Sequence, residues 1–135
     1  MAARLKRLAA DRRGGALVEF AVLLPFLMTM ILGTIDFGRM FYVRHGLEYA
    51  TEEAARYYML NPTTDTTNVT TALRSKMPGS MGPNVSVSYA DTASCNGNSA
   101  VTCTTITATY LFTFAAGLLE AGAQTLRATA RAVRY

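Results

Sequence analysis

The sequence has 135 residues, of which half are hydrophobic and 16% are charged. This length suits one small domain, and the low charge argues against a disordered chain, a coiled coil or a nucleic-acid-binding tail. With one His and two Cys in the chain, a zinc site built from several such side chains is disfavoured, and we expect no metal and no cofactor.

The positive charge lies at the N-terminus. Segment 1–14 holds five basic residues against Asp11 alone, which equals the whole formal net charge of +4. The remainder holds as many acidic as basic residues, so it is formally neutral. Because no Lys/Arg cluster follows this segment, we expect no nucleic-acid partner.

Residues 16–35 read ALVEFAVLLPFLMTMILGTI, an apolar run with one charged residue, Glu19. The run is long enough to cross a hydrocarbon core of roughly 30 Å. Since the basic segment precedes it, the positive-inside rule places the N-terminus in the cytoplasm and the C-terminal part on the exported side. A cleaved secretory signal is the competing interpretation, but its apolar stretch should span about 7–15 residues and end at a small-residue site.

Two residues are unusual in such a run. Glu19 is a carboxylate near the start of a membrane helix, which marks a function unless the interface solvates it. Pro25 removes a backbone donor, so it should kink or loosen the helix, although membrane helices also tolerate proline.

Residues 12–20, RRGGALVEF, resemble the processing site of type IV prepilins of the tight-adherence (Tad, or Flp) branch. The shared pattern is a basic leader, Gly14, four residues, then Glu19 followed by the aromatic Phe20. The continuation over 18–60 resembles the TadE-like family of minor pilins. The common features are VEFA, a proline after a double leucine, the run GTIDFGR at 33–39 and AARY at 54–57.

The resemblance implies a bacterial inner-membrane protein of three parts: a leader at 1–14, a helix at 15–60 and an exported domain at 61–135. The chain would enter a surface pilus after processing. Its partners would be a prepilin peptidase, other pilin subunits and the pilus assembly platform. The resemblance implies no catalytic residues and no small-molecule substrate.

The same resemblance implies a cut after Gly14, which makes Gly15 the first residue and Glu19 the fifth. A cut after Gly15 would instead make Ala16 the first residue, and the spacing favours Gly14. In an assembled pilus, Glu19 would pair with the free amine of a neighbouring subunit.

Residues 36–60 continue the helical pattern. Apolar residues recur at steps of three and four and predict one buried stripe: Met40, Val43, Leu47, Ala50, Ala54 and Tyr57 or Tyr58. Asn61-Pro62 should end the helix. A helix of about 45 residues is roughly 67 Å long, so its second half should project from the bilayer and pack on a small domain.

The rest of the chain predicts loops and strands. Residues 61–71 are Thr-rich and predict a loop, 72–77 a helical turn, and 115–123 a short helix or loop. Alternating segments at 84–90 and 101–114 predict an antiparallel pair around a loop at 91–100. Residues 124–135 fit a strand or a helix, and the resemblance favours a strand. The expected fold class is α+β, with the long helix packed on about three antiparallel strands.

Cys95 and Cys103 should form a disulfide that closes the hairpin, because oxidising conditions outside the inner membrane permit one. The alternative is two free thiols.

Three functions compete. The first is a minor pilin of a Tad/Flp-type pilus with a structural role in initiation, assembly or adhesion. The second is an unprocessed, single-pass interaction domain, which has no reason to keep the spacing from Gly14 to Glu19. The third is a membrane-bound enzyme using His45 with acids drawn from Asp36, Glu48, Glu52 and Glu53, for which the sequence offers no catalytic motif.

Overall fold

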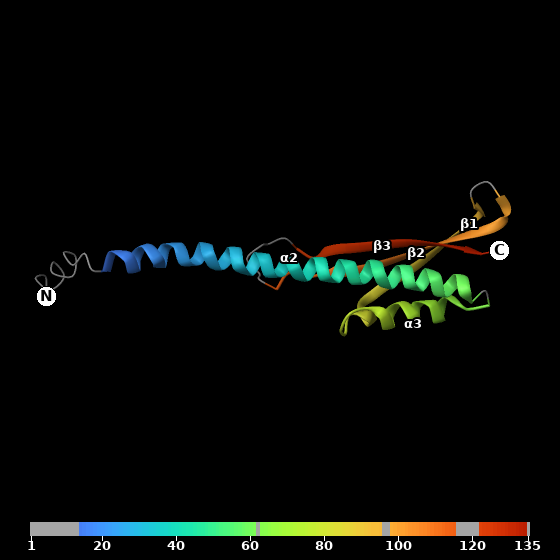
Figure 1. Cartoon of the computed structure of the whole chain (residues 1–135), viewed down its shortest axis with the longest axis horizontal. Coiled ribbons are helices and arrows are strands. Elements are labelled where there is room, and N and C mark those ends of the chain that lie inside the picture. Colours follow the sequence, from blue (N-terminus) through green and yellow to red (C-terminus); the bar gives the residue numbers. More distant parts are fainter. Residues whose placement is uncertain (1–13, 62, 96–97, 116–121, 135) are drawn as a thin grey trace, which may run out of the picture.

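The computed structural model describes residues 14–61, 63–95, 98–115 and 122–134 (Figure 1). One long helix, α2 (Gly15–Leu60), is followed by a short helix, α3 (Thr66–Lys76). A single 3-10 turn at Gly82–Asn84 leads into three strands, β1 (Val85–Cys95), β2 (Asn98–Phe112) and β3 (Gln124–Arg134). The expected α+β class, with a long N-terminal helix on a three-stranded antiparallel sheet, is confirmed.

Helix α2 runs for 46 residues without interruption and contains Pro25. It ends where the sequence predicted, at Asn61, whose backbone N–H and side-chain amide both donate to the Tyr57 carbonyl (3.1 and 2.9 Å). These bonds satisfy a carbonyl that the last turn would otherwise leave without a partner.

The sheet has the order β1-β2-β3, with both pairs antiparallel. The third strand, for which a helix was the alternative, is confirmed. The expected loop over 91–100 is wrong for its described part: residues 91–95 belong to β1 and residues 98–100 to β2. The strand pairing extends here because Thr104 donates a 2.6 Å hydrogen bond to the carboxylate of Asp91, its partner across the two strands. The buried hydroxyl of Thr104 therefore has a hydrogen-bond partner.

The Thr-rich segment is also different from its prediction, since residues 66–71 are helical. Val69 and Leu73 lie four residues apart and are fully buried, so packing outweighs the weak helix propensity of threonine. Thr70 and Thr71 donate their hydroxyls to carbonyls one turn back (2.9 Å each). The expected helical turn at 72–77 is the C-terminal part of this longer helix.

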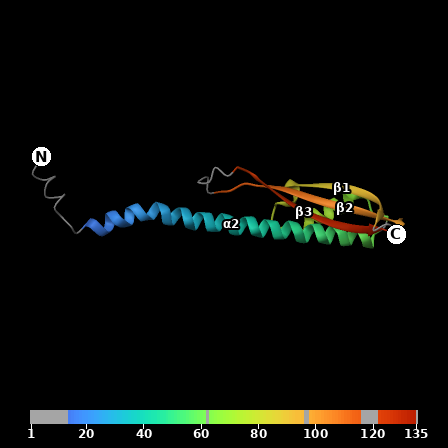
Figure 2. The same ribbon diagram turned by 90° about the horizontal axis from the view of Figure 1, so that it is seen from above.

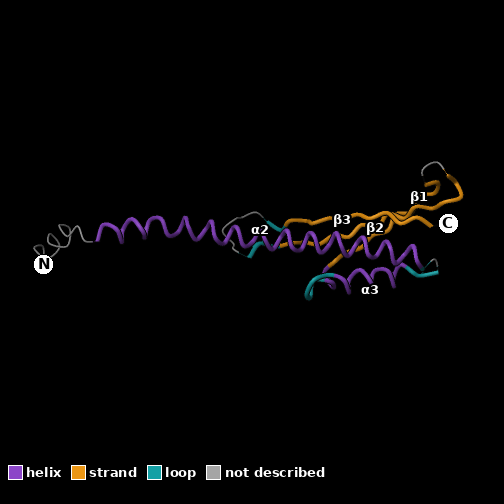
Figure 3. Tube along the Cα trace, viewed as in Figure 1, coloured by secondary structure: helices purple, strands orange, loops and turns teal. Residues whose placement is uncertain are grey.

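Both helices cover the same face of the sheet (Figure 3). The buried stripe of α2 is confirmed from Val43 onward, with Tyr58 rather than Tyr57 at its end, whereas Met40 is only partly buried. It packs with α3 and the inner face of the sheet around four fully buried side chains: Leu47, Val69, Leu73 and Ile106. Gly46 permits the close approach of the chain after α3, because a Cβ there would lie 2.7 Å from two ring carbons of Pro78.

The end of the domain farthest from residue 14 carries the disulfide. Cys95 and Cys103 are bonded, with their Cα atoms 5.4 Å apart, as the sequence predicted. Together with Val101 they form a second small core, against which Val133 packs. At this end the β1–β2 hairpin bends away from the two helices (Figure 1).

Candidate functional site

The N-terminal half of α2 makes no buried contact with the rest of the chain. Every residue from 15 to 35 is exposed except Leu24 and Gly33, which are partly covered. Large apolar side chains point outward all round it; Leu17 and Phe26, for example, are 73% and 67% exposed. Figure 2 shows this half extending well beyond the sheet.

An apolar surface of this kind is not stable in water and calls for a bilayer or for other apolar helices. By length and composition α2 can cross a membrane, and it is the one such helix among the described residues. Residues 1–13, which carry most of the expected leader, lie outside the described residues.

We call residues 15–35 of α2 the bare half. The two residues expected to act in subunit pairing lie near its start. Glu19 and Phe20 are both exposed, and within the described part of the chain Glu19 forms no ion pair. A partner for this carboxylate must therefore come from another molecule, from solvent or from outside the described residues.

The expected processing site lies at the helix N-terminus. Helix α2 begins at Gly15, and Gly14 occupies the N-cap position without a side-chain cap. A Cβ at either glycine would meet no atom within 4 Å, so neither residue is held by tertiary packing. The choice between a cut after Gly14 and one after Gly15 stays a prediction.

The bare half ends at Asp36, the first buried residue of α2, which is only 3% exposed. Arg39 donates to its carboxylate at 3.1 Å. The guanidinium of Arg39 also lies 5.7 Å from the ring centroid of Phe112, at the end of β2. The cation–π contact thus joins the end of the central strand to the helix at the boundary between its halves, and the ion pair within α2 holds Arg39 in place for it.

An aromatic cluster extends this junction. The rings of Phe112 and Phe114 meet edge to face at 5.3 Å, and Phe114 meets Phe37 of α2 at 6.1 Å. A shallow pocket of about 310 Å³ lies beside the cluster, lined by Arg39, Tyr42, Val43, Met81, Tyr110, Phe112 and Thr113. The sequence placed Asp36 at the membrane boundary but did not reveal its burial, for which Arg39 three residues later was the available signal.

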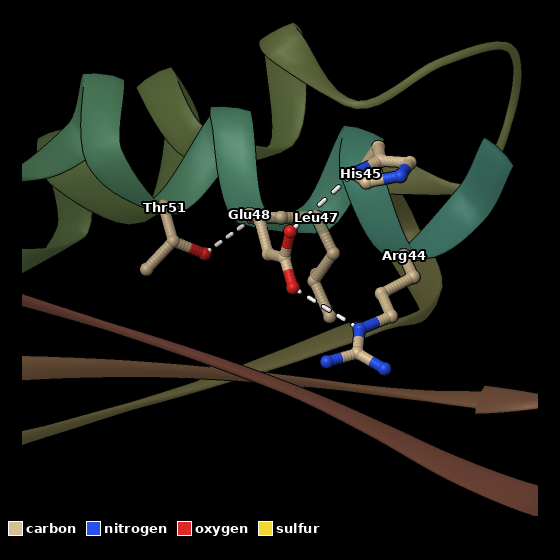
Figure 4. A network of polar contacts seen from close by, with 5 residues as sticks. All are labelled: Arg44, His45, Leu47, Glu48 and Thr51. Atoms are coloured by element: carbon tan, nitrogen blue, oxygen red, sulfur yellow. Dashed lines mark hydrogen bonds and ion pairs between the residues drawn. The ribbon is translucent and has the colours of Figure 1, made fainter. Parts of the chain in front are cut away.

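The residues considered for an enzyme do not converge. His45 is 75% exposed, and its Nδ1 lies 3.5 Å from Glu48, which also accepts a 3.1 Å hydrogen bond from Arg44 (Figure 4). Asp36 lies twelve residues before Glu48 on the same helix, or about 18 Å from it along the helix axis. Among the described residues, no three His, Cys, Asp or Glu side chains are grouped to hold a metal ion.

The structure therefore has one helix that is apolar, exposed and long enough to cross a membrane over its first half, and that supports a small sheet with its second half. Residues 14–56 match the family described as TadE-like protein, so the resemblance to the TadE-like family is confirmed over this segment. The family is one of pilin-like, structural proteins associated with the Tad pilus, and it is not a known enzyme family.

The family match covers the bare half of α2 and most of its packed half, and it ends before α3 and the sheet. No curated protein and no solved structure matches the chain.

Proposed function

We propose that this chain is a minor pilin of a Tad/Flp-type pilus, processed by a prepilin peptidase and acting structurally in pilus initiation, assembly or adhesion. The observation that carries the proposal is the spacing from Gly14 to Glu19 at the start of an apolar helix with no buried contact to its own domain. An ordinary membrane anchor needs the apolar length but not this spacing.

The position of the two glycines supports cleavage there. A peptidase acts on extended backbone, and Gly14 and Gly15 are the residues at which a helix end opens with least loss. Cleavage after Gly14 removes a leader that holds all of the net positive side-chain charge. The positive-inside signal is then gone, and the helix is free to leave the bilayer.

In the filament, the bare half of α2 would pack against the same segment of other pilin subunits. Glu19, which costs free energy in an apolar environment, would pair with the new N-terminal amine of a neighbour. This pairing sets the axial register between subunits. Pro25, inside the same segment, would give the helix a local bend or loosening for packing.

The orientation follows from the basic leader. The leader faces the cytoplasm, α2 crosses the inner membrane, and residues 61–135 form the exported domain. The Cys95–Cys103 disulfide agrees with this orientation, because such bonds persist in oxidising compartments.

The experiment is the intact mass and N-terminal sequence of the membrane-extracted chain, from cells with and without the prepilin peptidase. A peptidase-dependent start at Gly15 is the expected result and places Glu19 fifth. A start at Ala16 keeps the processing but places Glu19 fourth. An intact leader in both samples contradicts the proposal and favours the unprocessed, membrane-anchored interaction domain.

The role of Glu19 has its own test, with Glu52→Ala as the matched control because Glu52 is an exposed acid on the packed half of the same helix. Glu19→Ala should leave membrane insertion intact and reduce incorporation into pili, whereas the control should assemble normally. Normal incorporation of Glu19→Ala would remove the carboxylate from the assembly mechanism.

A further inference from the structure

In its middle part, the face of the sheet turned away from the helices carries mainly hydroxyl and guanidinium side chains. We call it the outer face and define it by nine residues: Ser86, Ser88, Ala90, Thr105, Thr107, Thr109, Arg127, Thr129 and Arg131. Side chains alternate along a strand, and the intervening residues Ile106, Ala108 and Ala128 are buried against the helices. No helix covers the outer face among the described residues (Figure 3).

The strand register arranges the outer face in three rows. Thr109 lies between Ser86 and Arg127, and Thr107 lies between Ser88 and Thr129. Thr105 lies between Ala90 and Arg131. Each row therefore places a threonine of the central strand beside an exposed Arg or Thr of β3.

The charge of this face is of one sign. Arg127 and Arg131 are exposed, and neither forms an ion pair within the described residues. The outer face as defined carries no carboxylate, since the one acidic residue of β1, Asp91, lies on the inner side and is bonded to Thr104. The Cα atoms of Arg127 and Arg131 are about 13–14 Å apart, because the two residues are four positions apart on one strand.

We propose that the outer face binds an acidic polysaccharide, a linear sugar polymer bearing carboxylates. A guanidinium recognises a carboxylate through two parallel hydrogen bonds. The exposed hydroxyls of Ser86, Ser88 and Thr129 can donate to and accept from sugar hydroxyls. Thr109 donates its own hydroxyl to the Ser86 carbonyl and can still accept, whereas Thr107 is only 8% exposed and supports the array from below. Threonine is stiff at χ1 and the sheet holds it in place, so the array loses little freedom when a ligand binds.

Other partners fit this surface poorly. A protein interface has an apolar, aromatic-rich centre. The nine residues of the outer face include only Ala90 as an apolar side chain, and the exposed Leu111 lies at their edge, two residues after Thr109 on β2. A single-stranded nucleic acid needs aromatic side chains for its bases to stack on, and this face has none. A duplex needs many phosphate contacts, for which two arginines are few. A lipid surface needs apolar side chains to insert.

The test measures binding of the full-length chain in detergent to immobilised alginate, a polyuronate, with neutral dextran as the reference surface. The variant Arg127→Gln/Arg131→Gln is compared with Arg56→Gln/Lys76→Gln, which removes two exposed cations from the helices. We expect the first variant to lose about tenfold or more of its alginate affinity and the second less than about twofold. The basic leader is present in every sample and contributes the same background.

Equal losses in the two variants would show that alginate responds only to net charge and would overturn the proposal, as would equal binding to alginate and dextran. A double-stranded DNA fragment that binds more tightly than alginate, with the same loss in the first variant, would assign the face to nucleic acid instead. Melting temperature and non-reducing gel mobility check that each variant is folded.

Should the glutamine variant fail to fold, Arg127→Lys/Arg131→Lys keeps the charge while losing the two-pronged geometry. Its alginate affinity should fall below that of the wild type and of the helix control, but by less than the loss of about tenfold or more expected for the glutamine variant. An unchanged affinity would overturn the role of the guanidinium groups. Because the assay needs neither cleavage nor a filament, its failure is distinguishable from a failure of the pilin proposal.

Discussion

The two halves of α2 share one continuous helix and differ in almost everything else. The first half, residues 15–35, is apolar on all sides and has no buried side chain. The second half, from Asp36 to Leu60, buries one stripe against α3 and the sheet and exposes charged and aromatic residues on the other side. The two halves therefore differ in their side chains and in what these contact, and not in backbone conformation.

The comparison separates two kinds of stability. The second half is held by its own chain, so substitutions there should change the free energy of unfolding of the domain. The first half has no buried side chain. Under the proposed function, substitutions there should change insertion and assembly while the domain keeps its stability. Asp36 marks the boundary.

The largest test of this division pairs Leu47→Ala with Leu27→Ala. Leu47 is fully buried, whereas Leu27 is 47% exposed in the bare half. Loss of the Leu47 side chain should lower the free energy of unfolding by about 2–5 kcal/mol through lost burial and an unfilled cavity. The measurement is denaturant unfolding of the full-length chain in detergent, followed by the circular dichroism of the sheet.

Leu27→Ala should leave the same transition within about 0.5 kcal/mol. A comparable loss in both variants would mean that the bare half stabilises the domain, and the division between the halves would fail.

A second test uses two glycines with opposite expected signs. Gly46→Ala would place a methyl group 2.7 Å from the Pro78 ring, so the chain must shift, and we expect about 1–3 kcal/mol of destabilisation. Gly38→Ala meets no atom within 4 Å, so it should gain up to about 1 kcal/mol of helix propensity. Melting temperatures of the two variants should move in opposite directions, and movement in one direction would contradict this reading of the packing.

A third test places the boundary itself. Asp36→Asn keeps the shape of the buried side chain but removes the charge that faces Arg39. Because Arg39 is half exposed, the loss should be modest, about 1–2 kcal/mol. Glu52→Gln is the control, an exposed acid that should change unfolding by less than about 0.5 kcal/mol. If Asp36→Asn equals its control, the fastening of β2 to α2 resides in the aromatic cluster instead.

The same contrast explains which parts of the fold could be predicted from the sequence. The bare half is predictable because twenty apolar residues after a basic segment have few interpretations, and the stripe of the second half follows from steps of three and four. The three strands are predictable from alternation, although alternation alone left 124–135 open between strand and helix.

The parts that sequence reasoning missed depend on tertiary contacts. Threonine disfavours helices, so the start of α3 could be found only by noticing that Val69, Leu73 and Met77 share one face and are all buried. Residues 91–95 look like a loop because Asp91 and Ser94 are weak strand formers, and the partner Thr104 that supports Asp91 lies in another strand. The burial of Asp36 was likewise not apparent from the sequence, in which Arg39 three residues later is its visible partner.

The smallest effect concerns Tyr89, which joins β1 to α3 on the side of the domain away from the bare helix. Its hydroxyl lies 2.8 Å from that of Thr70 and 3.1 Å from the Thr66 carbonyl, so the two hydroxyls and this carbonyl form one hydrogen-bonded group. Burial raises the pKa of Tyr89 above its usual value of 10.0, and the hydrogen bond with Thr70 offsets part of that rise. A raised pKa means that the fold favours the protonated phenol, so this stabilisation is complete below about pH 10 and is lost as the pH rises through the folded pKa. Tyr89→Phe should cost about 0.5–1.5 kcal/mol at neutral pH, the range for a lost hydrogen bond. It should also flatten the fall in unfolding free energy above about pH 10, and an alkaline fall of the same size in both proteins would assign that pH dependence to other groups.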